Sequence, residues 1–121
     1  MKLRALRGAI TVDENSVDAI LDGTEELLRA VIELNGLETE NLVSCIFTTT
    51  DDLNAEFPAV AARRIGLSSV PLLGAREMNR PGALPRVIRV LVHCYLAPER
   101  PAQHVYLRDA VRLRQDLEGA Q

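Results

Sequence analysis

The sequence predicts an α+β fold in which helices pack on one face of a mixed β-sheet. Strand-like and helix-like segments alternate in the first half of the chain, and strand-like segments dominate the second half. The predicted order is strand, helix, strand, helix and then three strands, which makes five strands in all. The length of 121 residues allows one domain, and the 3% aromatic content requires its core to be mainly aliphatic.

The first strand and the first helix have clear periodicity. Residues 2–12 alternate loosely between apolar and polar side chains and predict a strand, in which Gly8 would allow a close approach of the backbone. Residues 13–16 form a polar break with candidate N-caps, among them Ser16. From Val17 onward, apolar residues recur at intervals of three and four, which predicts an amphipathic helix of about five turns. Asn35 and Gly36 tolerate the left-handed conformation, so we expect the helix to end there.

The second strand and helix follow directly. Residues 42–50 are apolar and β-branched, which predicts a buried central strand. The aspartates at 51–52 offer N-caps for a helical turn that runs through Phe57. Pro58 suits the first turn of a second helix, which Gly66 would close.

Three more strands are expected in the second half, at residues 69–75, 86–96 and 104–113, with a loop rich in Pro and Gly at 79–85. Helices on one face of the sheet leave its other face uncovered. Strands 42–50 and 86–96 offer few polar positions, so we expect this second face to be apolar and to be buried by oligomerisation.

The net charge and the cysteine residues limit which binding partners and which cellular compartment we expect for the protein. The net charge of -3 gives no overall attraction to nucleic acid or to anionic lipid, so we expect no nucleic-acid partner and no membrane association. Arg4 and Arg7 interrupt the apolar amino terminus, which does not resemble a signal peptide. Cys45 and Cys94 stand among apolar residues, which indicates reduced thiols in a cytoplasmic protein. The Cys and His spacings give no zinc signature, so no metal site is predicted.

The cations are almost all arginine: of 14 Lys and Arg residues, only Lys2 is a lysine. Four of the arginines lie within or beside apolar runs, namely Arg7, Arg63, Arg89 and Arg114. Arg89 stands in the middle of a predicted strand, where its charge must be paired. Two interpretations remain open. Arg89 is a structural residue paired with a carboxylate such as Glu77, or several arginines form a pocket for a small dianion, with Glu77 and Tyr106 as further partners.

Five blocks follow one another along the sequence: RGAITV, TTDDLNAEFPAVAARR, VPLLGAREM, IRVLV and HVYLRDAVRLRQDL. Taken together and in this order, they resemble the small monofunctional chorismate mutases of the trimeric, Bacillus type. The resemblance extends to about residue 117. It implies a single domain at 1–117, followed by a frayed tail at 118–121.

The resemblance also implies a function and an assembly. The enzyme would be an isomerase that carries out the intramolecular [3,3] rearrangement of chorismate to prephenate, in phenylalanine and tyrosine biosynthesis, without a cofactor. The family fold is a five-stranded mixed sheet with helices on one face. Three such subunits form a homotrimer, described as a pseudo-α/β barrel, with the active sites between subunits.

Carried over by motif, the family's site positions fall on eleven residues. Three match catalytic positions: Arg89 at the breaking ether oxygen, Glu77 at the substrate hydroxyl and Arg7 at a carboxylate. Eight match substrate-binding positions: Phe57, Arg63, Leu72, Leu73, Gly74, Tyr106, Leu113 and Arg114. Among these, Tyr106 would hold a carboxylate, Phe57 and Arg63 would come from the neighbouring subunit, and Leu113 and Arg114 would close near the site.

Three positions depart from the Bacillus-type pattern. Gly74 replaces a cysteine near the substrate hydroxyl, Val60 replaces a lysine and Leu73 replaces a threonine. Two alternatives to the mutase are kept: an imine/enamine deaminase of similar shape, and a non-catalytic binder or regulator with an arginine pocket for small carboxylates.

Overall fold

The computed structural model describes residues 1–113, so the predictions for Arg114 and for the tail at 118–121 lie outside the described residues. The chain forms the strands β1 (Lys2–Thr11), β2 (Leu42–Thr49), β3 (Leu72–Arg76), β4 (Val87–Leu96) and β5 (Val105–Leu107), and the helices α1 (Val17–Asn35) and α2 (Pro58–Arg64). Two short 3-10 turns, η1 (Thr39–Asn41) and η2 (Arg108–Ala110), complete the described elements. No helix in this part of the chain has the length and apolar character needed to cross a bilayer.

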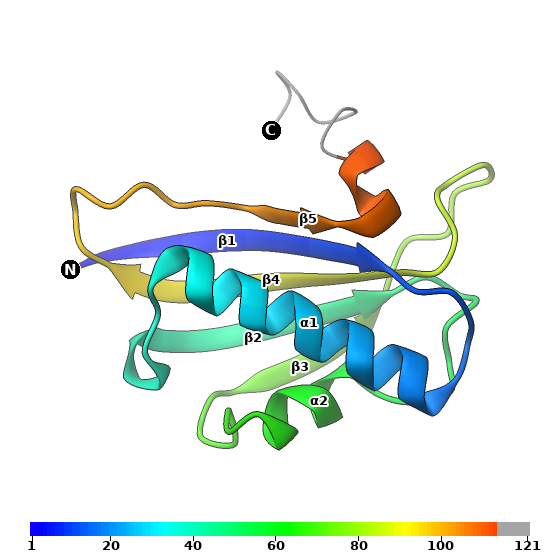
Figure 1. Cartoon of the computed structure of the whole chain (residues 1–121), viewed down its shortest axis with the longest axis horizontal. Helices are drawn as coiled ribbons and strands as arrows, with labels where there is room; N and C mark the ends of the chain where they lie inside the picture. Colours follow the sequence, from blue (N-terminus) through cyan, green and yellow to red (C-terminus); the bar gives the residue numbers. More distant parts are fainter. Residues whose placement is uncertain (114–121) are drawn as a thin grey trace.

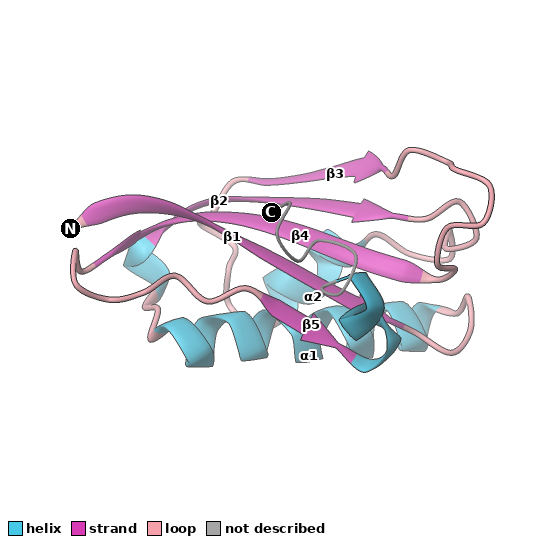
Figure 2. Ribbon diagram, turned by 90° about the horizontal axis from the view of Figure 1, so that it is seen from above, coloured by secondary structure: helices cyan, strands magenta, loops and turns pink. Residues whose placement is uncertain are grey.

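The five strands form one mixed sheet in the order β3-β2-β4-β1-β5 (Figure 1). β4 runs antiparallel to both β1 and β2, whereas β3 is parallel to β2 and β5 is parallel to β1. Viewed from the edge, α1 and α2 lie together on one side of the sheet (Figure 2). The predicted α+β architecture and the order of its strands and helices are confirmed.

The core lies between α1 and the sheet. β1 and β4 contribute the side chains that alternate toward the helix, among them Leu6, Ile10 and Val92, and Leu27 and Val31 of α1 meet them. All five are no more than 2% exposed. The expectation of an aliphatic core is correct, because Phe47 is the one aromatic side chain among the buried hydrophobic residues described.

Gly8 lets α1 rest directly on β1. A Cβ built at this position would lie 3.0 Å from Val90 Cγ1, 3.1 Å from Leu27 Cδ1 and 3.3 Å from Val31 Cγ2. An added methyl would therefore have to push side chains of the sheet and of the helix back by a few tenths of an ångström at the same time. The close approach predicted for Gly8 is confirmed.

The ends of α1 follow the predicted signals. Ser16 caps the first turn, because its Oγ accepts a hydrogen bond from the Ala19 N–H at 3.1 Å. Gly36 ends the helix in the left-handed conformation, with φ 61°.

The helical turn predicted for residues 51–57 is absent, and that prediction is wrong. Phe57 precedes a proline and adopts an extended conformation, with φ -83° and ψ 127°. The two aspartates have other partners: Asp51 accepts a bond from Arg76 Nε, and Asp52 accepts one from the Arg86 N–H. Neither carboxylate caps a helix in the described structure.

Two strand boundaries also differ from the prediction. Residues 67–70 form a turn closed by a bond from the Val70 N–H to the Leu67 carbonyl, so β3 begins at Leu72 rather than at 69. The extended segment predicted at 104–113 stops after Leu107. Arg108 takes a left-handed conformation there, with φ 54°, which ends β5 and starts η2.

The sheet face away from the helices, here called the uncovered face, is less apolar than expected. Leu3, Leu73 and Tyr95 on it are 55%, 61% and 43% exposed. The strand pairing places Ala9 opposite Arg89 and Arg7 opposite Leu91, so both arginines stand on the same face as these apolar groups. The expectation of an apolar face therefore holds only in part, since Arg7 and Arg89 occupy its centre.

The Gly8 contacts predict a stability effect. We expect Gly8→Ala to lower the free energy of unfolding by about 1–3 kcal/mol, because the added methyl overpacks the contact between α1 and β1. Gly74→Ala is the matched control, since a Cβ there meets no atom within 4 Å. Urea unfolding measures both variants, and equal midpoints for the two would contradict the close approach at Gly8.

Candidate functional site

A cavity of about 430 Å³ opens on the uncovered face and is here called the cation cavity. Its polar lining comes from four strands and the segment that follows β3: Arg7, Thr48, Glu77, Arg89 and Tyr106. The sheet register brings these residues together. Thr48 is opposite Arg89, Arg89 is opposite Ala9, and Ala9 is opposite Tyr106. The cavity is therefore a direct product of the strand order.

Arg89 and Glu77 form the ionic contact at the centre of the cation cavity. Arg89 Nε lies 3.1 Å from Glu77 Oε1, with the two side chains 37% and 28% exposed. The geometry is that of an ion pair rather than a hydrogen bond, because the buried Nε has no aligned acceptor. Thr48 Oγ1 donates a hydrogen bond of 2.7 Å to the same Glu77 oxygen and fixes the carboxylate in place. The predicted Arg89–Glu77 pair is confirmed.

Within the described residues, the terminal nitrogens of Arg89 form no hydrogen bond or ion pair. The guanidinium is thus anchored through its Nε side by Glu77, in a cavity that also holds Arg7. A fork of N–H donors held in this way matches a carboxylate or a developing oxyanion.

Arg7 is on β1 and stands beside His104, the residue that precedes β5. The Arg7 backbone N–H donates to His104 Nδ1 at 3.0 Å, which requires that nitrogen to be unprotonated. His104 is exposed on its outer side, but partial burial, and then the charge of Arg7, lower its pKa below the ordinary 6.5. The neutral imidazole therefore joins the start of β5 to the strand that carries Arg7.

A second cavity of about 790 Å³ adjoins the cation cavity and shares Glu77 and Arg89 with it. Leu113, one of the predicted substrate-binding residues, lines this second cavity. It packs against a small cluster that contains Ala9, Val87 and Ala110, in which η2 covers one corner of the uncovered face. Leu113 thus lies next to the predicted catalytic residues, as expected for a segment that closes near the site.

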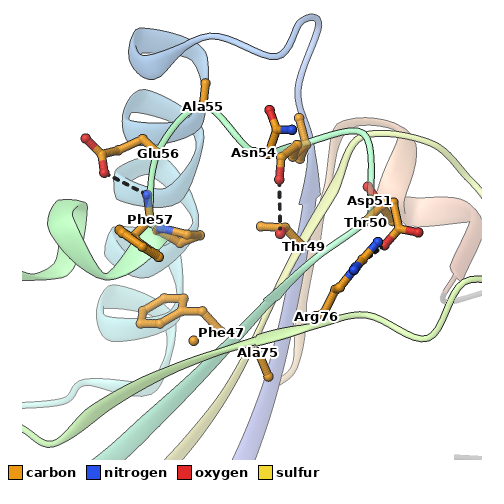
Figure 3. A pocket seen from close by; sticks show the side chains of 13 residues that line it. Phe47, Thr49, Thr50, Asp51, Asn54, Ala55, Glu56, Phe57, Ala75 and Arg76 are labelled. Carbon is orange, nitrogen blue, oxygen red and sulfur yellow. Dashed lines mark hydrogen bonds and ion pairs between the residues drawn. The ribbon is translucent and has the colours of Figure 1, made fainter.

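Phe57 and Gly74 lie elsewhere. They line a cavity of about 680 Å³ on the helix side of the sheet, here called the phenylalanine cavity. Figure 3 shows Phe57 near Phe47 at one side of this cavity and Arg76 with Asp51 at the other. The Arg76 hydrogen bond lowers the pKa of Asp51.

The remaining predicted residues are divided between the two sides. Leu72 is opposite Cys45 and packs toward the core, whereas Leu73 is opposite Ile46 on the uncovered face. Arg63 is exposed in the last turn of α2. One protomer therefore brings Arg7, Glu77, Arg89 and Tyr106 together, but it does not bring Phe57, Arg63 or Gly74 to them.

The side chains of the cation cavity suit the binding of an anion. Burial raises the pKa of Cys45 to about 11, so this thiol stays protonated and unreactive. Across the described chain, no three His, Cys, Asp or Glu side chains gather in a metal-binding group. The cation cavity instead offers two guanidinium groups, a carboxylate and a phenol around a space of small-molecule size.

Two residues of the site were missed from the sequence. Thr48 is part of a β-branched run, and only its pairing with Arg89 shows that it supports Glu77. The signal available in the sequence was the alternation along residues 42–50, which puts Thr48 on the same face of the strand as Ser44 and Ile46. His104 lies two residues before Tyr106, but nothing in the sequence shows its bond to the Arg7 backbone.

Residues 3–117 match the protein family described as chorismate mutase type I. The chorismate mutase AroH of Thermus thermophilus is 54% identical to this chain over 121 aligned residues, which cover 98% of this chain and 99% of that protein. The AroH chorismate mutase of Bacillus subtilis is 39% identical, over 97% of this chain and 94% of its own length. A solved chorismate mutase from Clostridium thermocellum superimposes with a TM-score of 0.87 at 43% identity, covering 90% of this chain and 98% of that chain.

His104 predicts a pH dependence of stability. Its pKa is lower in the folded protein than in the unfolded chain, so the unfolded chain binds the proton more readily. The stabilisation is complete above about pH 6.5 and is lost as the pH falls toward the folded-state pKa. Urea unfolding between about pH 7 and pH 5 should show a smaller loss of stability in His104→Gln than in the parent protein.

The matched control is His93→Gln, because His93 Nδ1 contacts only the Ser44 hydroxyl in the described structure. His93→Gln removes the other imidazole of the chain and leaves the bond between the Arg7 N–H and His104 in place. A His104→Gln protein that loses as much stability as the parent over this range would contradict the link to Arg7.

Proposed function

The chain belongs to the type I chorismate mutases, and on that basis we propose that it rearranges chorismate to prephenate in the cation cavity. The observation that supports this location is the Arg89–Glu77 contact, fixed by Thr48 and faced by Arg7 and Tyr106. The relatives support the mutase over the deaminase and the non-catalytic binder that the sequence left open. The reaction leads toward phenylalanine and tyrosine.

The chemistry explains why cations and a carboxylate suffice. One C–O bond of chorismate breaks while one C–C bond forms within the same molecule, so the product is an isomer and no proton or electron is transferred. The enzyme can then contribute positioning and electrostatics. The substrate is a flexible dianion that must adopt a compact, chair-like conformation, and groups that hold its carboxylates select that conformation.

In this proposal Arg89 is the main catalytic residue. In the transition state C–O cleavage is ahead of C–C formation, so negative charge gathers on the ether oxygen. A guanidinium already held there stabilises the transition state more than the bound substrate. Glu77 orients this guanidinium through Nε, which leaves its terminal N–H groups for the substrate. Glu77 Oε2 is then the oxygen that would accept the substrate hydroxyl, since Oε1 already receives Thr48.

Arg7 and Tyr106 hold a substrate carboxylate. Both line the cation cavity, from neighbouring strands that run parallel. A charged fork and a phenolic hydroxyl supply directional donors to one planar anion. Leu113, next to this group, would limit access of water.

The second half of the site comes from a neighbouring subunit of a homotrimer, in which the sheets meet as a pseudo-α/β barrel. Phe57 and Arg63 stand on the helix side of their own protomer, away from Arg89. They can join a cation cavity only if it belongs to another copy. The exposed apolar residues of the uncovered face, Leu3, Leu73 and Tyr95, support an assembly through that face. A cytoplasmic location suits the two free, buried cysteines.

The assignment of Arg89 is tested by its removal. The parent protein should consume chorismate with saturable kinetics, measured as loss of ultraviolet absorbance together with formation of prephenate. We expect Arg89→Ala to keep the fold and oligomer and to lose at least about two orders of magnitude in kcat, since a transition-state contact is deleted. Turnover near the parental rate in a folded Arg89→Ala protein would refute the role of Arg89.

The shared site is tested by mixing two inactive variants. Arg63→Ala and Arg89→Ala damage different halves, so a hybrid trimer restores one intact site at the boundary where the two undamaged halves meet. Random exchange of equal amounts should recover about a quarter of the parental activity per site. Mass spectrometry of the mixed oligomers controls for exchange. Full exchange without recovered activity would count against sites built from two subunits.

A further inference from the structure

The strand that carries Tyr106 is the shortest in the sheet and lies at its edge. β5 has three residues and pairs on one side only, with Gly8, Ala9 and Ile10 of β1. An edge strand of this length is marginal, because few backbone hydrogen bonds hold it and it can open locally at low cost. The position of Tyr106 in the cation cavity therefore depends on contacts outside the strand pairing.

Asn35, the last residue of α1, holds the chain just before β5. Its side chain is fully buried. Asn35 Oδ1 accepts a hydrogen bond of 2.8 Å from the Gln103 N–H, and Nδ2 donates to the Gln103 carbonyl at 2.9 Å and to the Val31 carbonyl at 3.0 Å. The Asn35 side-chain amide thus bonds both backbone groups of Gln103, as a neighbouring strand would. Through this residue, α1 holds the chain where it enters β5.

Arg108 holds the other end of β5 to the same helix. Its NH2 donates to Glu26 Oε1 at 2.7 Å, and its NH1 donates to the Thr11 carbonyl at 3.2 Å. The next N–H, that of Asp109, donates to Thr11 Oγ1 at 3.1 Å. These contacts join the end of β5 to the end of β1 and to the middle of α1 (Figure 1).

The backbone of Arg108 points to a role for its side chain. Its φ of 54° lies in the left-handed region, which glycine adopts without steric strain and which L side chains disfavour. An arginine is unfavourable there unless its side chain offsets the strain. The contacts with Glu26 and Thr11 supply that compensation, because both are charge-assisted.

We propose that Arg108 is a positioning residue for substrate binding, and that its contacts with Glu26 and Thr11 set the place of Tyr106 in the cation cavity. The inference rests on the proposed function in one respect, the role of Tyr106 as a ligand of a substrate carboxylate. Only Leu107 separates Arg108 from Tyr106, so a shift at the end of β5 moves the phenol relative to Arg7 and Arg89.

This role predicts a particular kinetic signature. Tyr106 would hold the carboxylate in the ground state and in the transition state alike, so its displacement weakens binding without slowing the chemical step. Loss of the Arg108 contacts should therefore raise KM for chorismate by about threefold to tenfold and change kcat by less than about twofold.

Two variants remove the contact from opposite sides. Arg108→Gly deletes the side chain at a position where glycine adopts the left-handed backbone without strain. A change in KM can therefore be attributed to the lost contacts rather than to backbone strain. Glu26→Ala removes the partner from an exposed position of α1 and leaves β5 untouched. We expect both variants to show the KM increase, and the double variant to be no worse than Arg108→Gly, which already removes the contacts with both Glu26 and Thr11. Glu25→Ala is the matched control, since Glu25 is the neighbouring residue and pairs only with Arg29 in the described structure.

A spectroscopic measurement reports on Tyr106 without turnover. The chain has two tyrosines and no tryptophan, so Tyr95→Phe leaves Tyr106 as the one tyrosine fluorophore. In this background we expect Arg108→Gly and Glu26→Ala to increase the quenching of Tyr106 fluorescence by iodide, because the displaced phenol is more accessible to the ion. Glu25→Ala should leave the quenching equal to that of the Tyr95→Phe protein.

The outcomes separate this inference from the proposed function. Parental KM and parental quenching in both variants, even with lowered thermal stability, would overturn the positioning role and leave the mutase assignment intact. If the parent protein fails to convert chorismate, the proposed function is wrong, and the quenching result alone decides whether Arg108 positions Tyr106.

Discussion

The contact between Arg89 and Glu77 is the constraint around which the site is built. A guanidinium in the middle of a central strand must face a counter-charge, because desolvating it alone is costly. β4 is flanked by β1 and β2 in the sheet, and the counter-charge comes from beyond β2, from the segment that follows β3. The parallel pairing of β3 with β2 does this by placing Ala75 beside Thr48, which itself pairs with Arg89. Glu77 then follows at the position from which it reaches both Thr48 and Arg89.

Helix α1 has two functions in this arrangement. Its apolar stripe forms the core with the inner face of the sheet, and this fixes the side to which every residue of β1 and β4 points. A shift of one residue in either strand would turn Arg7 or Arg89 toward the helix. Its polar residues Asn35 and Glu26 reach past the edge of the sheet and contact the backbone or the side chain at the two ends of β5. The helix that stabilises the fold therefore also supports the outer wall of the cation cavity.

The division of the predicted site between two sheet faces gives an architectural reason for assembly. Alternation along β3 puts Leu73 on one face and Gly74 on the other, and the same rule separates Gly74 from Arg89 across the sheet. In the proposed site, Phe57 and Arg63 would have to come from a second copy, because they lie on the helix side of the chain that carries them. The uncovered face has cations at its centre and exposed apolar residues around them, a composition that suits both proposed roles, substrate binding and self-association.

Much of the fold and the core of the site could be predicted from the sequence, because they depend on local patterns. Periodicity predicted β1, α1 and β4, glycine and serine marked the ends of α1, and an arginine within an apolar strand indicated a paired charge at Arg89. The resemblance of its motifs indicated the family, which the comparisons confirm. The tertiary structure alone decided what depends on distant partners. Asp51 and Asp52 bind Arg76 and the Arg86 N–H instead of capping a helix, Arg108 ends β5 through contacts with α1 and β1, and Phe57 lies in a different cavity from Arg89. The physical reason is that a hydrogen bond or an ion pair between segments up to 98 residues apart leaves no trace in either segment's own sequence pattern.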